Sequence, residues 1–120
     1  MKLYGVRVFV RDWERACAFY GDVLGLPLRF KDAAVGWAEF DVGGPVIGVE
    51  RVDPEGDAAD PERLVGRFVG ISLEVDDIAA TYQRLRRRGV SFRSPPQRQP
   101  WGGVLAHLED PEGNVLTLLG

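Results

Sequence analysis

The sequence predicts an α+β protein built from two βαβββ halves, and three observations support this fold class. One sequence pattern occurs twice, so that Asp12 corresponds to Asp77 at an offset of 65 residues and Gly25 to Gly89 at an offset of 64. Each half shows the same succession of an alternating strand, a helical apolar stripe and three short strands. An acidic, proline-bearing segment separates the halves. Because a solenoid needs at least about three units, a repeat present twice indicates two modules that face each other across a cleft.

The amino-acid composition excludes several classes of protein. The 120 residues are 45% hydrophobic and 28% charged, which suits one globular domain, residues 1–120, that buries roughly two-thirds of its unfolded surface. The net charge of −3 argues against a nucleic-acid partner. Cys17 is the only cysteine, so no intrachain disulfide forms. A signal-peptide apolar core is missing, and no apolar run approaches the ~20 residues of a membrane span. We therefore expect a cytoplasmic protein without a membrane partner.

Module one is predicted over residues 1–51. It begins with a strand over 3–10, rich in β-branched and aromatic residues. Asp12 is expected to cap a helix whose apolar stripe includes Trp13 and Cys17, both of which should lie in the core. Gly25 permits the positive φ that ends the helix. Three short strands are predicted next, over residues 28–31, 36–42 and 46–51, with Gly43-Gly44-Pro45 as a turn.

Module two is predicted over residues 68–120, after a connector at 52–67 that we expect to be mobile or partly ordered. Its helix is capped by Asp76 or Asp77 and ends at Gly89. Its strands are predicted over residues 68–75, 91–93, 104–109 and 115–119. Arginines at the end of this helix complement the helix dipole and are expected to be solvated.

Five short motifs follow one another along the chain: Val10-Arg11-Asp12; Arg15-Ala16 with Phe19-Tyr20; Val23-Leu24-Gly25-Leu26; Pro100-Trp101-Gly102-Gly103; and Asp110-Pro111-Glu112-Gly113-Asn114. In this order and spacing the chain resembles the vicinal oxygen chelate superfamily, which contains glyoxalase I, extradiol dioxygenases, and bleomycin- and fosfomycin-resistance proteins. The resemblance implies the glyoxalase/bleomycin resistance fold, an open eight-stranded cup with helices outside and the ligand in its concave face. It also implies a homodimer.

Metalloenzymes of this superfamily place up to four ligands in the cup, on the first and last strands of each module. Carried onto this chain, the four positions are Gly5, Gly48, Gly70 and Thr117. Glycine has no side-chain ligand, a threonine hydroxyl is a poor one, and a catalytic divalent site needs about three protein ligands. We therefore expect no metal and no cofactor. A relocated site at Glu39, Glu74 and His107 is disfavoured by the positive charge of Arg7.

Strand alternation selects the side chains that face the cup. The candidate ligand-binding residues are Arg7, Phe9, Trp37, Glu39, Ser72, Glu74, His107 and Thr117, with Trp101 at the mouth of the cup. Trp37 and Trp101 suit a flat aromatic ligand. Arg7 and Glu74 each interrupt an apolar strand. They are expected either to form an ion pair across the module seam or to bind an anionic or carbonyl group and an amine.

Three hypotheses of function remain open. In the first, the cup binds a small aromatic or polar-aromatic molecule without a metal, as in antibiotic sequestration by bleomycin-resistance-like proteins. In the second, the chain is a lyase, isomerase or dioxygenase that uses His107 or Glu74 as a base, with or without a metal. The imidazole of a histidine suits acid–base chemistry near neutral pH, but His107 equally suits an ordinary hydrogen-bonded strand position. In the third, the cup is filled by its own side chains in a dimerising protein.

Overall fold

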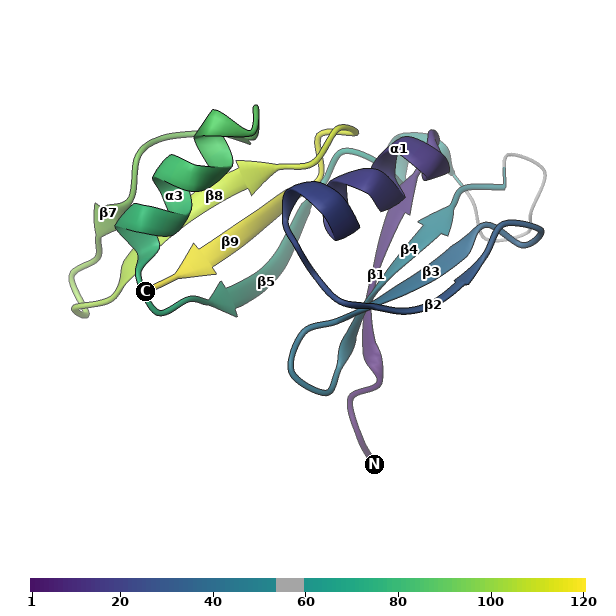
Figure 1. Ribbon diagram of the computed structural model, residues 1–120, viewed down its shortest axis with the longest axis horizontal. Coiled ribbons are helices and arrows are strands. Elements are labelled where there is room, and N and C mark those ends of the chain that lie inside the picture. The colour runs from purple at the N-terminus through teal and green to yellow at the C-terminus, as the bar shows by residue number, and fades with distance from the viewer. Residues whose placement is uncertain (54–59) are drawn as a thin grey trace.

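A computed structural model of the chain describes residues 1–53 and 60–120 (Figure 1). Module one forms a four-stranded sheet in the order β1-β4-β3-β2, in which β1 and β4 run parallel. Its elements are β1 (Gly5–Val10), α1 (Trp13–Ala18), the π-helix η1 (Phe19–Val23), β2 (Leu28–Asp32), β3 (Trp37–Asp41) and β4 (Val46–Arg51).

Module two forms the second sheet in the order β5-β9-β8-β6, with β7 paired to β8. Its elements are β5 (Phe68–Glu74), α3 (Ile78–Arg87), β6 (Ser91–Phe92), β7 (Gln97–Arg98), β8 (Val104–Glu109) and β9 (Val115–Leu119), preceded by α2 (Pro61–Leu64). The helix formed by α1 and η1 lies on the same side of the sheets as α3 (Figure 1). The two sheets together make an open cup rather than a closed barrel. In the described part of the chain, no helix is long and apolar enough to cross a membrane.

The helix caps follow from local chemistry and agree with the predictions. The carboxylate of Asp12 accepts a hydrogen bond from the backbone N of Arg15 at 3.2 Å. Asp77, rather than Asp76, caps α3 by accepting from the backbone N of Ala80 at 3.0 Å. Gly25 and Gly89 follow the helices with φ of 77° and 89°, a region that disfavours other residues.

The structure differs from the prediction where an element is short or depends on distant contacts. The first helix widens into the π-helix η1, where the Tyr20 hydroxyl donates a buried 2.9 Å hydrogen bond to Asp110 of module two. The two-residue strand β7 and the four-residue helix α2 were not predicted, because neither is long enough to show a periodicity. The structure therefore has nine strands rather than eight among the described residues. Residues 54–59 of the predicted connector lie outside the description.

One hydrophobic cluster includes side chains from both modules, among them Val8 and Tyr20 of module one and Leu108 of module two. Trp13 is buried, and its indole N–H donates to the carbonyl oxygen of Val49 at 3.0 Å. Cys17 is also buried, so the prediction that both residues belong to the core is confirmed.

The turn between β8 and β9 joins the modules through the side chain of Asn114. Its Nδ2 donates to the carbonyl oxygen of Phe9 at 3.0 Å and to Asp110 at 2.9 Å. Its Oδ1 accepts from the backbone N of Gly66 at 2.9 Å and of Arg67 at 3.3 Å. These bonds hold the end of β1 beside the start of β5, while the other ends of the two strands diverge (Figure 1).

Candidate functional site

The face of each sheet that turns away from the helices provides the candidate site. Along β1, Val8 and Val10 are buried, whereas Arg7 is exposed and Phe9 is half-buried. Along β8, Ala106 and Leu108 are buried and flank the half-buried His107. This alternation agrees with the predicted strand faces, and the cup face is therefore polar and aromatic over an apolar core.

The strand registers show which of these side chains are neighbours. In module one, a row of cross-strand partners runs from Arg7 through Gly48 and Glu39 to Phe30. In module two, Ser72, Thr117 and His107 form the corresponding row. The candidate residues thus form one group on each sheet.

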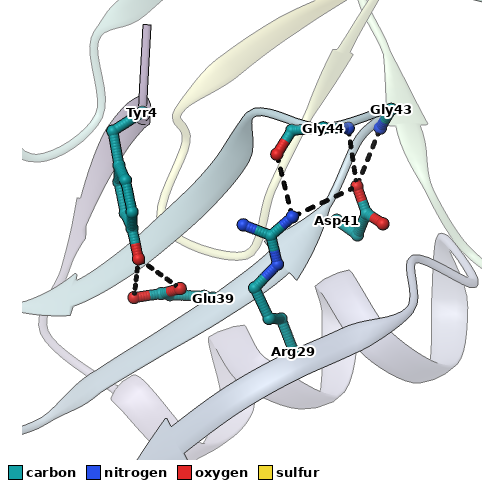
Figure 2. Close-up of polar contacts among 6 residues, drawn as sticks. All are labelled: Tyr4, Arg29, Glu39, Asp41, Gly43 and Gly44. Carbon is teal, nitrogen blue, oxygen red and sulfur yellow. Dashed lines mark hydrogen bonds and ion pairs between the residues drawn. The ribbon is translucent and has the colours of Figure 1, made fainter. Parts of the chain in front are cut away.

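Glu39 is the centre of the module-one group. Its carboxylate accepts a hydrogen bond from the indole Nε1 of Trp37 at 2.8 Å. The Tyr4 hydroxyl lies 2.7 and 2.8 Å from its two oxygens (Figure 2). Glu39 is only 8% exposed, so these two donors replace much of the water that a carboxylate normally binds.

The electrostatics of this group follow from the two donors. Hydrogen bonds from Trp37 and then Tyr4 lower the pKa of Glu39, because both stabilise the ionised carboxylate. The pKa of Tyr4 is raised, chiefly because ionisation would break its hydrogen bond to Glu39, and further by burial and by the negative charge of Glu39. The group therefore places a fixed negative charge beside the edge of the Trp37 indole.

Gly48 explains the position of that indole. A Cβ added at Gly48 would lie 2.2 Å from Cη2 of Trp37 and 2.8 Å from two further ring atoms. The ring therefore covers the glycine, where the resemblance implied a metal ligand. A side chain at this position and the observed placement of Trp37 exclude each other.

A second polar group lies next to this one on the same sheet. Arg29 donates to the carbonyl oxygen of Gly44 at 2.8 Å and lies 3.9 Å from the carboxylate of Asp41 (Figure 2). Backbone hydrogen bonds from Gly44 and Gly43 lower the pKa of Asp41. Arg29 is thus held by a turn at the edge of the cup.

Where the two modules meet, Phe9 has two guanidinium groups near its ring. The Cζ of Arg7 lies 5.4 Å, and that of Arg67 5.8 Å, from the ring centroid, both within cation–π range. Arg7 forms an ion pair with Glu50 at 3.3 Å. The predicted ion pair between Arg7 and Glu74 is therefore wrong, because β1 and β5 belong to different sheets and diverge away from the seam.

On the module-two side of the seam, Phe68 packs edge-on against His107 with ring centroids 5.7 Å apart. Nδ1 of His107 lies 2.8 Å from the hydroxyl of the buried Thr117. Ser72 and Glu74 lie further along β5, where Glu74 lines a cavity of about 520 Å³ together with Leu24, Leu73, Arg84 and other residues. Glu74 is thus separated from the Trp37–Glu39 group.

The residues present do not fit a metal site. Within residues 1–53 and 60–120, no group of three or more His, Cys, Asp or Glu side chains could hold a metal ion. The relocated site of Glu39, Glu74 and His107 is therefore not assembled. Glu39 already accepts from Trp37 and Tyr4, and His107 is bonded to Thr117.

Trp101 lies in the loop between β7 and β8 and is 65% exposed. A Cβ added at Gly103 would lie 1.9 Å from Cζ3 of Trp101, so the indole packs over its own loop. This placement keeps one of the largest apolar side chains at the surface.

Four residues near the cup were not among the predicted site residues: Tyr4, Phe30, Arg67 and Phe68. Strand alternation would place Tyr4 with Val6 on the core side, but the strand begins only at Gly5, so the alternation does not extend to Tyr4. Arg67 precedes a strand, so no periodic pattern could indicate its position. Phe68 could have been found, because extending the alternation of β5 back from Ser72 places it on the cup face.

Comparison with known proteins agrees with this architecture. Residues 3–118 match the family model described as the glyoxalase/bleomycin resistance protein/dioxygenase superfamily. The chain therefore belongs to this superfamily. Among curated proteins, it is 31% identical over 116 residues to a bleomycin resistance protein of Klebsiella pneumoniae, with 91% of this chain and 84% of the relative covered.

Solved structures show the same relationship. A superfamily member from Sphaerobacter thermophilus DSM 20745 has a TM-score of 0.79 and 31% identity, with 99% of this chain and 96% of that chain covered. TnmS3, an antibiotic binding protein from Streptomyces sp. CB03234, has a TM-score of 0.75 and 31% identity, with coverage of 98% and 93%. The fold predicted from the sequence is thus confirmed, including its open cup.

Proposed function

We propose that the chain binds a small, planar aromatic molecule in its cup without a metal, and that it sequesters the molecule rather than transforming it. The observation that carries this proposal is the Trp37 indole, which lies over Gly48 and is held at its edge by Glu39. A flat, pre-positioned ring offers stacking area at little cost in conformational entropy.

The remaining cup residues suit such a ligand. Pockets for small molecules are mostly apolar with a few placed polar groups. Phe9, Phe30 and Phe68 supply further aromatic surface, with Phe30 and Phe68 half exposed at 50% and 57%. Ser72 and His107 supply a hydroxyl and an imidazole group on the opposite sheet, where the buried Thr117 bonds to His107. The bleomycin resistance protein and the antibiotic binding protein among the relatives make an antibiotic the first ligand class to test.

We also propose that the chain acts as a cytoplasmic homodimer. In the described sheets, β1 and β5 are edge strands that do not pair with each other. Phe30 and Phe68 are half exposed in a single chain, and a second copy would supply a facing wall. An interface of this kind must bury roughly 1,200–2,000 Å² to be stable.

The test is a titration of the protein, in the presence of a chelator, with a panel of aromatic antibiotics that includes bleomycin. Binding is measured by tryptophan fluorescence and by calorimetry. At least one compound should bind with micromolar affinity and be recovered chemically unchanged. Trp37→Leu should weaken it about tenfold, as expected for the loss of one stacking contact. Gly48→Ala should also weaken it by displacing the indole.

Leu28→Ala is the matched control, because Leu28 is an exposed apolar residue of the same sheet that lines a cavity beside α1. This variant should bind as well as the wild type. Binding that survives Trp37→Leu and Gly48→Ala without change would contradict the proposed site. Recovery of a modified compound would instead favour an enzyme.

A further inference from the structure

The cup has an unbalanced positive charge at the seam between the modules. Arg7 and Arg67 both lie near the ring of Phe9, at 5.4 and 5.8 Å. Among the described residues, Arg7 is the one of the two that forms an ion pair, with the carboxylate of Glu50 at 3.3 Å. In the part of the chain that the structure describes, none of the ion pairs includes Arg67. The two guanidinium groups thus make one ion pair between them among the described residues.

The backbone of Arg67 is fixed even though its side chain is exposed. Its N donates to Oδ1 of the buried Asn114 at 3.3 Å, and its carbonyl oxygen accepts from the N of Val115 at 2.9 Å. Asn114 also bonds to the carbonyl oxygen of Phe9. The same amide therefore positions both Arg67 and the ring near which it lies.

This arrangement leaves the hydrogen-bonding edge of a guanidinium available. Arginine that packs on a ring keeps N–H donors for a second partner, and its planar fork matches a carboxylate, sulfonate or phosphate. Arg67 adjoins Phe68, whose ring packs against His107 of the same sheet, while its guanidinium lies near Phe9 of the other sheet. An anion bound here would therefore lie at the end of the cup where the two sheets meet.

We propose that Arg67, supported by Arg7, forms a subsite for the anionic group of an aromatic ligand, and that Asn114 positions it. This inference rests on the proposed function and narrows the ligand to an aromatic acid. The ring of the ligand is expected to stack on Trp37 or the phenylalanines, while its acidic group binds Arg67.

Two dyes of nearly the same shape provide the test. 8-Anilinonaphthalene-1-sulfonate carries an anionic group, and N-phenyl-1-naphthylamine lacks it. Arg67→Gln should weaken binding of the sulfonate about tenfold, as for the loss of a charge-assisted contact, and change binding of the neutral dye less than twofold. Arg67→Lys should restore part of the affinity. Added salt should weaken sulfonate binding more in the wild type than in Arg67→Gln.

Arg87→Gln is the charge-matched control, because Arg87 is an exposed residue in the last turn of α3. Circular dichroism would establish that each variant keeps the native fold. The subsite is overturned if Arg67→Gln leaves sulfonate binding unchanged, if both dyes lose affinity equally, or if the wild type does not bind the sulfonate. The proposed function fails separately if the neutral dye binds equally well to wild type and Trp37→Leu.

Discussion

At the scale of single residues, Glu39 shows how a nearly buried carboxylate is stabilised in its ionised form chiefly by neutral donors, with a smaller contribution from the charge of Arg29. Its oxygens accept from Trp37 and Tyr4, two neutral donors, and these bonds lower its pKa. Since neither donor carries a charge, these two bonds do not cancel the negative charge of Glu39. It fixes the indole by its edge, which would leave the ring face for the proposed ligand.

The same hydrogen bonds predict a pH-dependent contribution to stability. The folded-state pKa of Glu39 lies below its ordinary value of 4.5, so its stabilisation is fully present above pH 4.5 and is lost as the pH falls through the folded-state value. Tyr4→Phe should therefore lower the free energy of unfolding at pH 7, and the difference from wild type should shrink at pH 3. Urea unfolding at both pH values measures this.

Tyr82→Phe is the control for this experiment. The Tyr82 hydroxyl accepts from Arg86 at 3.4 Å and, in the described part of the chain, bonds to no carboxylate. Its effect on stability should not follow the titration of Glu39. A difference between Tyr4→Phe and wild type that stays constant from pH 7 to pH 3 would contradict the assigned role of Tyr4.

At the scale of elements, the turn between β8 and β9 contacts three separate segments. Asp110 accepts from Tyr20 of η1, while Asn114 contacts the end of β1 and the residues before β5. The sequence motif predicted a tight turn here, but a turn signature does not specify which distant groups its side chains will meet. The joining of the modules becomes visible only in three dimensions.

Asn114→Ala should cost about 3 kcal/mol of unfolding free energy. It removes four hydrogen bonds of a side chain that is 1% exposed, and it leaves buried polar partners unsatisfied. Urea unfolding measures the loss. Asp32→Ala, which removes a single turn bond to the N of Ala34, should cost less than about 1 kcal/mol. Equal losses in the two variants would contradict the linking role of Asn114.

The elements also show what sequence reasoning could and could not provide. Caps such as Asp12 and the buried faces of β1 and β8 depend on local spacing, and they were predicted. Contacts that depend on register between strands were missed, among them Arg7 with Glu50 and Tyr4 with Glu39. In β5, Gly70 has a φ of 80° and the register with β9 shifts between Phe68 and Ser72, an irregularity that alternation does not predict.

At the scale of the whole molecule, two half-sized sheets share one core. The hydrophobic cluster contains Val8 and Val49 from module one together with Leu85, Leu116 and Leu118 from module two. Neither sheet has a second layer of its own beyond one helix. Since each module buries its apolar side partly against the other, we expect the two modules to unfold together as one domain.

Native-state hydrogen exchange with increasing urea tests this expectation. Amides in the middle of β4 and of β9 should exchange with the same free energy of opening and the same dependence on urea, because both require global unfolding. The two-residue strands β6 and β7 should exchange through smaller, local openings, since they hold few backbone bonds. If β9 opened several kcal/mol below β4, the modules would be separate folding units, and the seam bonds of Asn114 would not couple them. In that case the anion subsite, which takes Arg7 from one module and is held by Asn114 of the other, would be lost whenever module two opened alone.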